Sequence, residues 1–266
     1  MRTVPTRAGR LAVTIAGDGP PLLLLPANGR AADDFDAVRP RLQRHHRTIA
    51  LDWPAMGAAP APERPGDTTA ALLAGALEDA LDALGVARAR FVGHSVGGFA
   101  AARLAARAPE RVAALVLVDA GGFAELGTFG RLFCAVKGRP AVTRALEGRF
   151  ARFHTRSRGA VVARMLARVD AARRRAGYAD VVGAVWRSFA RPESDLRGEA
   201  QAIRCPALLV WGARDPVVPL AAGRTAARTI SGARLAVLET GHTPFVEDPE
   251  GFLGHVEPFL AGVPPG

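Results

Sequence analysis

One segment constrains the fold of this chain more than any other: a short apolar run that passes through a cluster of glycines into an Ala-rich stretch. Residues 89–94, ARFVGH, are apolar and β-compatible, as in a buried strand, whereas residues 96–106, VGGFAAARLAA, are typical of a helix. A single serine, Ser95, lies between them among the glycines at positions 93, 97 and 98. A plain connection does not need so many small residues, so the pattern predicts a sharp and crowded turn from a strand into a helix.

The same order of strand and helix recurs along the chain. Runs typical of strands occur at 10–17, 21–26, 47–53, 111–120, 207–215 and 233–240, and helical spacing occurs at 33–46, 68–85, 219–230 and 248–262. This alternation predicts an α/β fold in which a mostly parallel sheet of about eight strands carries helices on both faces. Ligands of such sheets bind at the carboxyl ends of the strands.

Residues 121–200 interrupt the alternation. They contain three or four helical segments rich in Arg and Ala, and no strand pattern appears among them. We expect a core formed by residues 1–120 and 201–266, with an all-helical lid at 121–200 inserted after the sixth strand and lying over the strand ends. Its candidates for lining an apolar substrate pocket are Phe129, Phe133 and Trp186. Packing of the lid onto the core is the alternative explanation for most of its aromatic residues.

An excess of basic residues is concentrated in the same stretch. The chain has a formal net charge of +10, and residues 122–200 contain sixteen Lys/Arg against seven Asp/Glu. Lys137 is the only lysine in the chain, and such use of Arg alongside abundant Ala and Gly is typical of a coding bias. No nucleic-acid-binding motif accompanies the charge, so we expect no nucleic-acid partner and interpret these arginines as a solvated helix face.

The cysteine and hydropathy patterns are typical of a reducing compartment. Cys134 and Cys205 lie far apart, without the spacing of a zinc site or a disulfide framework. No apolar run approaches the ~18 residues that cross a bilayer, and the first residues contain no signal-peptide core. We therefore expect a soluble cytoplasmic protein that has no metal site and no membrane partner.

The glycine-flanked serine fits a chemical motif as well as a turn. Residues 93–97 match G-x-S-x-G, and the strand before and the helix after them are the context that this motif requires. A serine on such a strained turn is lifted clear of the sheet, and the Val96 N–H at the helix N-terminus is placed to stabilise an oxyanion. Ser95 is therefore a candidate nucleophile. The alternative is a tight packing turn with an incidental serine.

A serine nucleophile needs a base, and one of the six histidines stands out. His242 lies in a Gly-flanked loop directly after the last predicted strand, at the same edge of the sheet as Ser95. Surface or packing roles are expected for the other five, at positions 45, 46, 94, 154 and 255. His94, which lies inside the turn, is also a candidate for the substrate pocket.

The base in turn needs an orienting acid, and two aspartates follow strands at the same edge. Asp215 follows the strand at 207–215, and Asp119 ends the strand at 111–120. We favour Asp215 and keep Asp119 as the rival. Ser95, Asp215 and His242 then occur in the chain order Ser, Asp, His of α/β-hydrolases.

Taken together and in order, the motifs resemble the α/β-hydrolase superfamily, in its lid-bearing group of esterases, C–C bond hydrolases and perhydrolase-like enzymes. The segments that carry the resemblance are PPLLLLPANG, LDWPAMGAAP, GHSVGG, LVLVDAGG, LLVWGARDPVVP and ETGHTPFVEDPEGF. The resemblance implies Ser95 as nucleophile, Asp215 as acid and His242 as base. Serine rather than aspartate at the turn argues against haloalkane dehalogenase and epoxide hydrolase chemistry.

The chain departs from this family after its first central strand. The family usually has His-Gly there, whereas this chain has Pro26-Ala27 followed by Asn28. By alignment the backbone N–H of Asn28 takes the donor position and joins that of Val96 in an oxyanion hole. The change alters how the loop is held, and it allows the Asn28 side chain to point at the ligand.

These residues together predict a serine hydrolase that cleaves a carboxylic ester, or a related acyl bond, of a small to medium apolar substrate through an acyl-enzyme on Ser95. Two alternatives remain open. One is a C–C bond hydrolase, lyase or cyclase that uses the same site, and the other is a non-catalytic ligand-binding relative. We expect a small-molecule substrate, no cofactor, and a monomer or homodimer.

Overall fold

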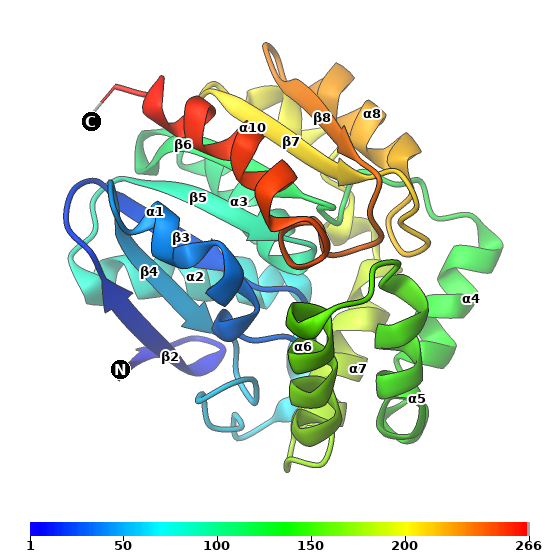
Figure 1. The fold of residues 1–266 in the computed structure, drawn as a ribbon. Helices are drawn as coiled ribbons and strands as arrows, with labels where there is room; N and C mark the ends of the chain where they lie inside the picture. Colours follow the sequence, from blue (N-terminus) through cyan, green and yellow to red (C-terminus); the bar gives the residue numbers. More distant parts are fainter. Residues whose placement is uncertain (265–266) are drawn as a thin grey trace.

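Eight strands form one sheet in the order β1-β2-β4-β3-β5-β6-β7-β8, in a computed structural model that describes residues 1–264 (Figure 1). The strands are β1 (Arg2–Thr6), β2 (Gly9–Ala16), β3 (Pro21–Leu25), β4 (Arg47–Asp52), β5 (Ala89–His94), β6 (Val112–Val118), β7 (Ala207–Gly212) and β8 (Arg234–Leu238). The β1–β2 and β2–β4 pairs are antiparallel, and the other pairs are parallel. The predicted mostly parallel sheet of about eight strands is confirmed.

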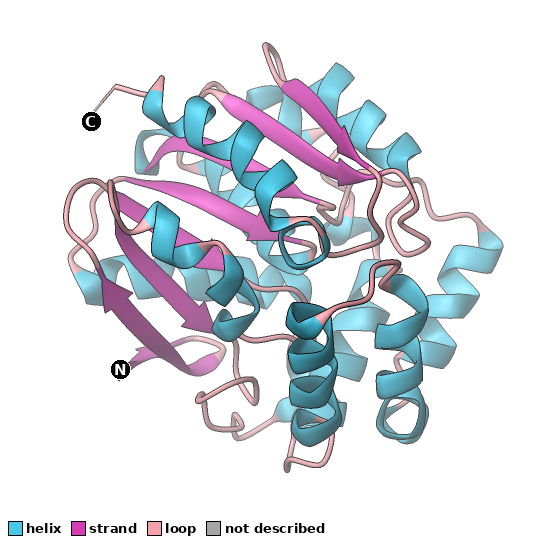
Figure 2. Cartoon of the chain, in the orientation of Figure 1, coloured by secondary structure: helices cyan, strands magenta, loops and turns pink. Residues whose placement is uncertain are grey.

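Helices cover both faces of this sheet, as Figure 2 shows. The helices outside the β6–β7 connection are α1 (Arg39–Leu42), α2 (Ala70–Leu84), α3 (Val96–Arg107), α8 (Leu220–Thr229), α9 (Pro244–Glu247) and α10 (Pro249–Ala261). Consecutive side chains of a strand point to opposite faces, and β3 follows this rule. Leu23 and Leu25 belong to the apolar cluster that contains α2 and α3, whereas Leu22 and Leu24 belong to the cluster that contains α10.

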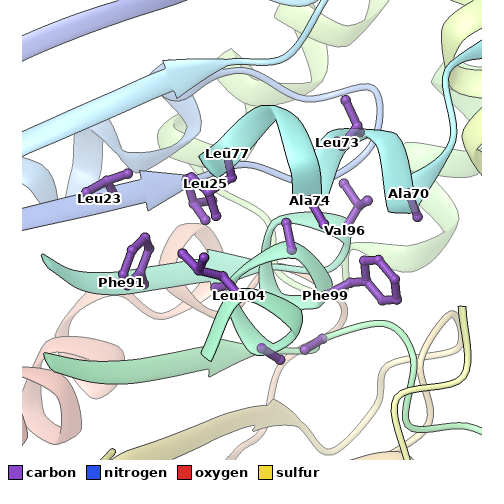
Figure 3. Packing of buried hydrophobic residues seen from close by; sticks show 14 of the residues in the cluster. Leu23, Leu25, Ala70, Leu73, Ala74, Leu77, Phe91, Val96, Phe99 and Leu104 are labelled. Carbon is purple, nitrogen blue, oxygen red and sulfur yellow. The ribbon is translucent and has the colours of Figure 1, made fainter. Parts of the chain in front are cut away.

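Figure 3 shows the first of these clusters at the point where β5 passes into α3. Leu25 of β3, Phe91 of β5 and Leu77 of α2 belong to this cluster, and all three side chains are fully buried. Val96, the first residue of α3, is buried in the same cluster. A closely packed cluster resists displacement of any one of its side chains. The packing of Val96 therefore holds the turn that carries Ser95 in place.

The sheet differs from the prediction at its N-terminal edge. β1 was not expected, because Arg2–Thr6 is mostly exposed and contains Pro5, and only Val4 is buried. The helix predicted at 33–46 is interrupted: a short 3-10 helix covers Ala32–Ala37, and α1 covers Arg39–Leu42. Pro40 has no N–H to donate to the carbonyl of residue 36, so one continuous helix cannot form.

Four helices, α4 (Thr128–Lys137), α5 (Pro140–His154), α6 (Ala160–Ala172) and α7 (Tyr178–Phe189), lie between β6 and β7, with two short 3-10 turns after them. Within residues 119–206 the structure contains no strand. We call this segment the helical insert. In Figure 1 it lies beyond the carboxyl ends of the strands, with α4 and α5 on its outer side. None of the helices in residues 1–264 is long and apolar enough to cross a membrane.

Candidate active site

Ser95 occupies the sharp turn between β5 and α3, with φ 54° and ψ −111°. Such a conformation is unfavourable for a residue with a Cβ, at a cost of about 1–3 kcal/mol, and needs support from its surroundings. Here the Ser95 N–H donates to Val118 O (3.0 Å), and the Ser95 carbonyl accepts from the N–H groups of Phe99 (2.9 Å) and Gly121 (3.1 Å). The backbone is held on both sides, and the Ser95 hydroxyl forms no helix cap.

The glycines around Ser95 are required by close approach of backbone to backbone. A Cβ at Gly97 would lie 2.3 Å from Leu25 O, and a Cβ at Gly93 would lie 2.6 Å from Gly97 O. Neither contact can relax by a side-chain rotation, because both neighbours are main-chain atoms. The glycines therefore allow α3 to start directly against β3, which places Ser95 above the ends of the central strands.

His242 and Asp215 meet in a buried hydrogen bond. His242 Nδ1 lies 2.6 Å from Asp215 Oδ2, and the Asp215 side chain is fully buried. Asp215 Oδ1 accepts from the N–H groups of Val217 (2.7 Å) and Val218 (3.2 Å). Because the carboxylate can only accept, the proton of a neutral His242 ring lies on Nδ1, and Nε2 keeps its lone pair. No hydrogen bond joins Ser95 to His242 within residues 1–264; such bonds often tighten only when substrate binds.

Asp119, the rival acid, lies at the end of β6 and is also fully buried. Its Oδ1 accepts a hydrogen bond from the N–H of Gly212 (2.9 Å), and its Oδ2 forms no hydrogen bond within the described chain. Burial and the adjacent Asp215 carboxylate raise the pKa of Asp119 well above its usual range. Burial beside Asp215 thus disfavours the ionised form of Asp119, and Asp215 is the residue that contacts His242.

Two further histidines enclose His242. The ring of His94 lies 4.8 Å from the His242 ring, and its Nε2 donates to His242 O (2.6 Å). From the opposite side, His154 at the end of α5 accepts from the His242 N–H (2.9 Å), with its ring 5.3 Å from the His242 ring. Burial lowers the pKa of His94 and of His154 well below the usual value, so both rings are neutral. They fix the His242 backbone without adding charge.

The donor atoms of His94, Asp119 and His242 lie within 4.8 Å of one another, the arrangement closest to a metal site in the described part of the chain. Its chemistry does not suit a cation. His94 Nε2 already donates to a carbonyl, and burial raises the pKa of Asp119 and so disfavours its ionised form. A metal ligand must present a lone pair, and a carboxylate ligand must be ionised.

Glu247 on α9 ties the His242 loop to the helical insert. Its carboxylate accepts hydrogen bonds from four backbone N–H groups: Gly241 (3.1 Å), Thr243 (3.2 Å), Arg156 (2.6 Å) and Ser157 (2.9 Å). Glu247 is not among the site residues expected from sequence. Its short spacing from His242 was a local signal for contact with that loop, but nothing near it in sequence indicated contact with residues 156–157.

The loop after β3 is held in a way that does not need the histidine usual in the resembling family. Three hydrogen bonds hold it: Trp53 Nε1 to Pro26 O (2.8 Å), Tyr178 Oη to Gly29 O (2.9 Å) and Asn28 Nδ2 to Val182 O (3.0 Å). Two of the three partners belong to α7. The helical insert therefore takes part in positioning this loop.

The backbone N–H groups of Asn28 and Val96 form no hydrogen bond within the described residues. Val96 is the first residue of α3, and the first N–H groups of a helix have no partner inside it. Asn28 and Ser95 line the same cavity, and Asn28 Oδ1 is buried without a partner in residues 1–264. Two free amides and one free carbonyl oxygen thus lie near Ser95.

The cavity over Ser95 has a volume of about 340 Å³. Phe133, Cys134 and Trp186 line it from the insert, and the Phe133 and Trp186 rings lie 5.4 Å apart in an edge-to-face contact. Burial raises the pKa of Cys134 to about 11, so its thiol is neutral and weakly nucleophilic.

Two candidates for the pocket lie elsewhere. The structure places Phe129 on the outside of α4, 88% exposed, because the opposite side of α4 packs on α7. It places His94 below His242, 1% exposed and outside the cavity lining. Phe129 and Phe133 lie one turn apart on the same face of α4, and only Phe133 reaches the cavity, whereas Phe129 lies in solvent.

Behind the aromatic wall lies a buried ion pair between Lys137 and Glu147. The Lys137 ammonium is 4.9 Å from the centre of the Phe150 ring and 6.0 Å from that of Trp186. The only lysine of the chain therefore joins α4 to α5 and contacts the rings that shape the cavity. A buried pair of this kind confers geometry more than net stability.

Comparison with known proteins was made against family models, curated sequences and solved structures. A family model described as alpha/beta hydrolase fold matches residues 20–249. The chain is 30% identical to the pimeloyl-[acyl-carrier protein] methyl ester esterase of Chromobacterium violaceum, over 91% of this chain and 95% of that protein. It is 29% identical to a hydrolase from Pseudomonas aeruginosa (TM-score 0.84, 98% of both chains). It is 27% identical to the enol-lactonase from Burkholderia xenovorans (TM-score 0.82, 98% of this chain and 100% of that one).

Proposed function

The chain belongs to the alpha/beta hydrolase fold family, and we propose that it is a serine hydrolase that cleaves carboxylic esters through an acyl-enzyme on Ser95. The observation that carries the proposal is the His242–Asp215 hydrogen bond of 2.6 Å, formed at the same edge of the sheet as the strained Ser95 turn. Similarity to proteins named as an esterase and an enol-lactonase supports an ester or a lactone as substrate. A lactone is a cyclic ester, so both undergo the same acyl transfer.

In the proposed first half-reaction, His242 Nε2 removes the proton of the Ser95 hydroxyl while Oγ attacks the carbonyl carbon of the ester. The N–H groups of Asn28 and Val96 donate to the oxyanion of the tetrahedral intermediate. Asp215 holds the imidazolium that forms and keeps its own negative charge. The intermediate collapses, the C–O bond of the ester breaks, and the alcohol leaves with the proton from His242.

In the second half-reaction, water attacks the acyl group on Ser95 and gives a proton to His242. The same two N–H groups hold the second oxyanion. Collapse breaks the bond to Ser95 Oγ, which takes the proton back, and the carboxylic acid is released. A lactone follows the same steps, except that the leaving hydroxyl stays attached to the acyl group through the ring carbons, so hydrolysis releases a single hydroxy acid.

The cavity supports an apolar acyl group of small to medium size as the preferred substrate. Its wall contains the rings of Phe133, Trp186 and Phe189, and its volume of about 340 Å³ lies at the lower end of typical ligand sites. We propose that the helical insert acts as a lid that supplies this wall and excludes water from Ser95. Asn28 Oδ1 is the free acceptor for a hydroxyl or N–H group on the substrate.

The proposal is tested with a fluorophosphonate probe and a series of p-nitrophenyl esters of increasing acyl length. We expect labelling of one serine and a burst of p-nitrophenol, both absent in Ser95→Ala and both retained in the matched control Ser194→Ala, which changes another serine of the same cavity. Turnover that survives in Ser95→Ala would refute the mechanism. Labelling of Ser95 without release of p-nitrophenol from any ester would instead favour the hypothesis of a C–C bond hydrolase or lyase.

A further inference from the structure

The outer face of the helical insert exposes large apolar side chains that nothing in residues 1–264 covers. Six of the nine exposed large hydrophobic residues of the described chain lie on α4 and α5. Four of them, Phe129, Leu132, Phe133 and Val136, recur at the spacing of one helix face, and we call them the α4 stripe. Phe129 is 88% exposed and Leu132 58%. On α5, Phe153 and Leu146 are exposed as well.

The residues of α4 and α5 are predominantly basic, whereas the exposed Glu125, which lines the same cavity, lies just before α4. Between residues 126 and 169 the chain has nine arginines, one lysine and a single acidic residue, Glu147, and that residue is buried in its pair with Lys137. The exposed residues Arg131, Arg139, Arg144 and Arg149 form no ion pair within the described chain. The apolar stripe is therefore bordered by uncompensated cations.

The stripe also borders the cavity that contains Ser95. Phe133 belongs to both, since it is 44% exposed and lines the cavity, and the adjacent Gly130 lines the cavity too. Whatever covers the α4 stripe therefore lies against the entrance to that cavity.

The charge distinguishes between possible occupants of this face. A second copy of the chain placed symmetrically on the stripe would bring two sets of uncompensated arginines together, which is unfavourable. A surface of anionic amphiphiles offers both complements at once, since its acyl region accepts the rings and its phosphates bind guanidinium groups. An acidic protein would satisfy the arginines but does not require four large apolar side chains in solvent.

We propose that the α4 stripe and the surrounding arginines dock the helical insert onto an anionic lipid surface, with the cavity entrance facing that surface. The insert lies on the surface and does not span it, because α4 has only 10 residues. This proposal reverses the expectation from sequence that the chain has no membrane partner. Docking needs only the outer face of the insert, so it stands independently of the reaction at Ser95.

The experiment is co-sedimentation of the full chain with vesicles, either equimolar phosphatidylglycerol and phosphatidylcholine or phosphatidylcholine alone. We expect binding to the anionic vesicles that weakens in high salt, and at least roughly tenfold weaker binding to the neutral ones. The double variant Phe129→Ser/Leu132→Ser should lower anionic-vesicle affinity roughly tenfold or more. The matched control Ile15→Ser/Val237→Ser, which removes exposed apolar residues elsewhere, should bind as the wild type does.

A second variant keeps the test decisive if the first one unfolds. Arg144→Gln/Arg149→Gln removes two exposed cations that make no ion pair, and it should also weaken binding to anionic vesicles. Equal binding to both vesicle types, or no binding to either, would overturn the proposal. So would a wild-type dimer that Phe129→Ser/Leu132→Ser dissociates, because the stripe would then be an interface between copies. Vesicle binding that depends on the arginines but not on the stripe would be purely electrostatic and would equally overturn the proposal.

Discussion

The strand ends and the outer face of the helical insert differ in whether their charged groups have partners within the chain. At the strand ends, Asp215 receives three hydrogen bonds, and burial beside it raises the pKa of Asp119 well above its usual range. On the outer face of α4 and α5, four exposed arginines form no ion pair in the described chain, and the Phe129 ring is 88% exposed. The first region pairs the His242 ring and the Asp215 carboxylate within the chain, as the proposed reaction centre requires. The second is complementary to something outside the chain.

The largest effect expected at the strand ends is that of Ser95→Ala. The loss of the nucleophile should lower kcat/KM for esters by on the order of 10⁴-fold or more, with folding unchanged. Steady-state kinetics of the variant and of Ser194→Ala measure this, and the control should stay within roughly tenfold of wild type. Comparable losses in both would show that the cavity as a whole, and not one hydroxyl, carries the activity.

The next effect separates the two buried aspartates. Asp215→Asn should lower kcat/KM by on the order of 10⁴-fold, because an amide donates to His242 Nδ1 and favours the wrong tautomer. Asp119→Asn should change kcat/KM by less than about tenfold, because an amide resembles the neutral acid and still accepts from Gly212. The same kinetic assay compares them. If Asp119→Asn were the more damaging change, the assignment of the orienting acid would be reversed.

Within the insert, the buried pair Lys137–Glu147 should show the largest effect on stability. Lys137→Met leaves Glu147 buried without its partner, and it should lower the free energy of unfolding by about 3–5 kcal/mol. Denaturant unfolding measures this. Lys137→Met/Glu147→Leu is the control, since replacing both charges should restore most of the loss. A double variant as unstable as the single one would mean that the pair contributes stability beyond neutralising its two buried charges.

The smallest effect concerns the histidine that joins the two regions. The pKa of His154 is below its usual value of 6.5 in the folded state, so the unfolded chain binds a proton first as the pH falls. Its contribution to stability is complete above pH 6.5 and is lost progressively below it, by up to about 1.4 kcal/mol per pH unit. His154→Gln should flatten this dependence, as thermal unfolding between pH 7 and roughly pH 5 would measure. The exposed His255→Gln should leave the dependence unchanged.

The parts of the molecule that sequence predicts well are those encoded locally. The strand, turn and helix around Ser95 lie within one short segment. The steric requirement at positions 93 and 97 appears in the sequence directly, as the glycines themselves. The break at Pro40 also had a local signal. β1 had none, because its single buried residue, Val4, leaves no alternating pattern.

The parts that sequence did not predict depend on distant pairing. Which face of α4 is buried depends on its packing against α7, so nothing local separates Phe133 from Phe129. The contact of Glu247 with Arg156 joins residues 91 positions apart. The protonation state of Asp119 results from burial beside Asp215, which only the assembled sheet creates. Long-range contacts of this kind leave no periodicity for a sequence pattern to report.

The hydrogen bonds of Glu247 limit where the helical insert can be replaced, in evolution or in the laboratory. Glu247 binds the main chain at residues 156–157 through N–H groups, so the contact tolerates almost any side chain there but no change in the path of the backbone. Residues 128–137, by contrast, make no hydrogen bond to Glu247 or to the His242 loop. A graft of a foreign helix over 128–136, which keeps Lys137 for its buried pair with Glu147, should therefore change which surface or substrate the insert contacts and leave the proposed proton transfer intact. A graft whose junction falls at 154–157 would displace the loop that carries His242, even if Ser95, Asp215 and His242 were all retained.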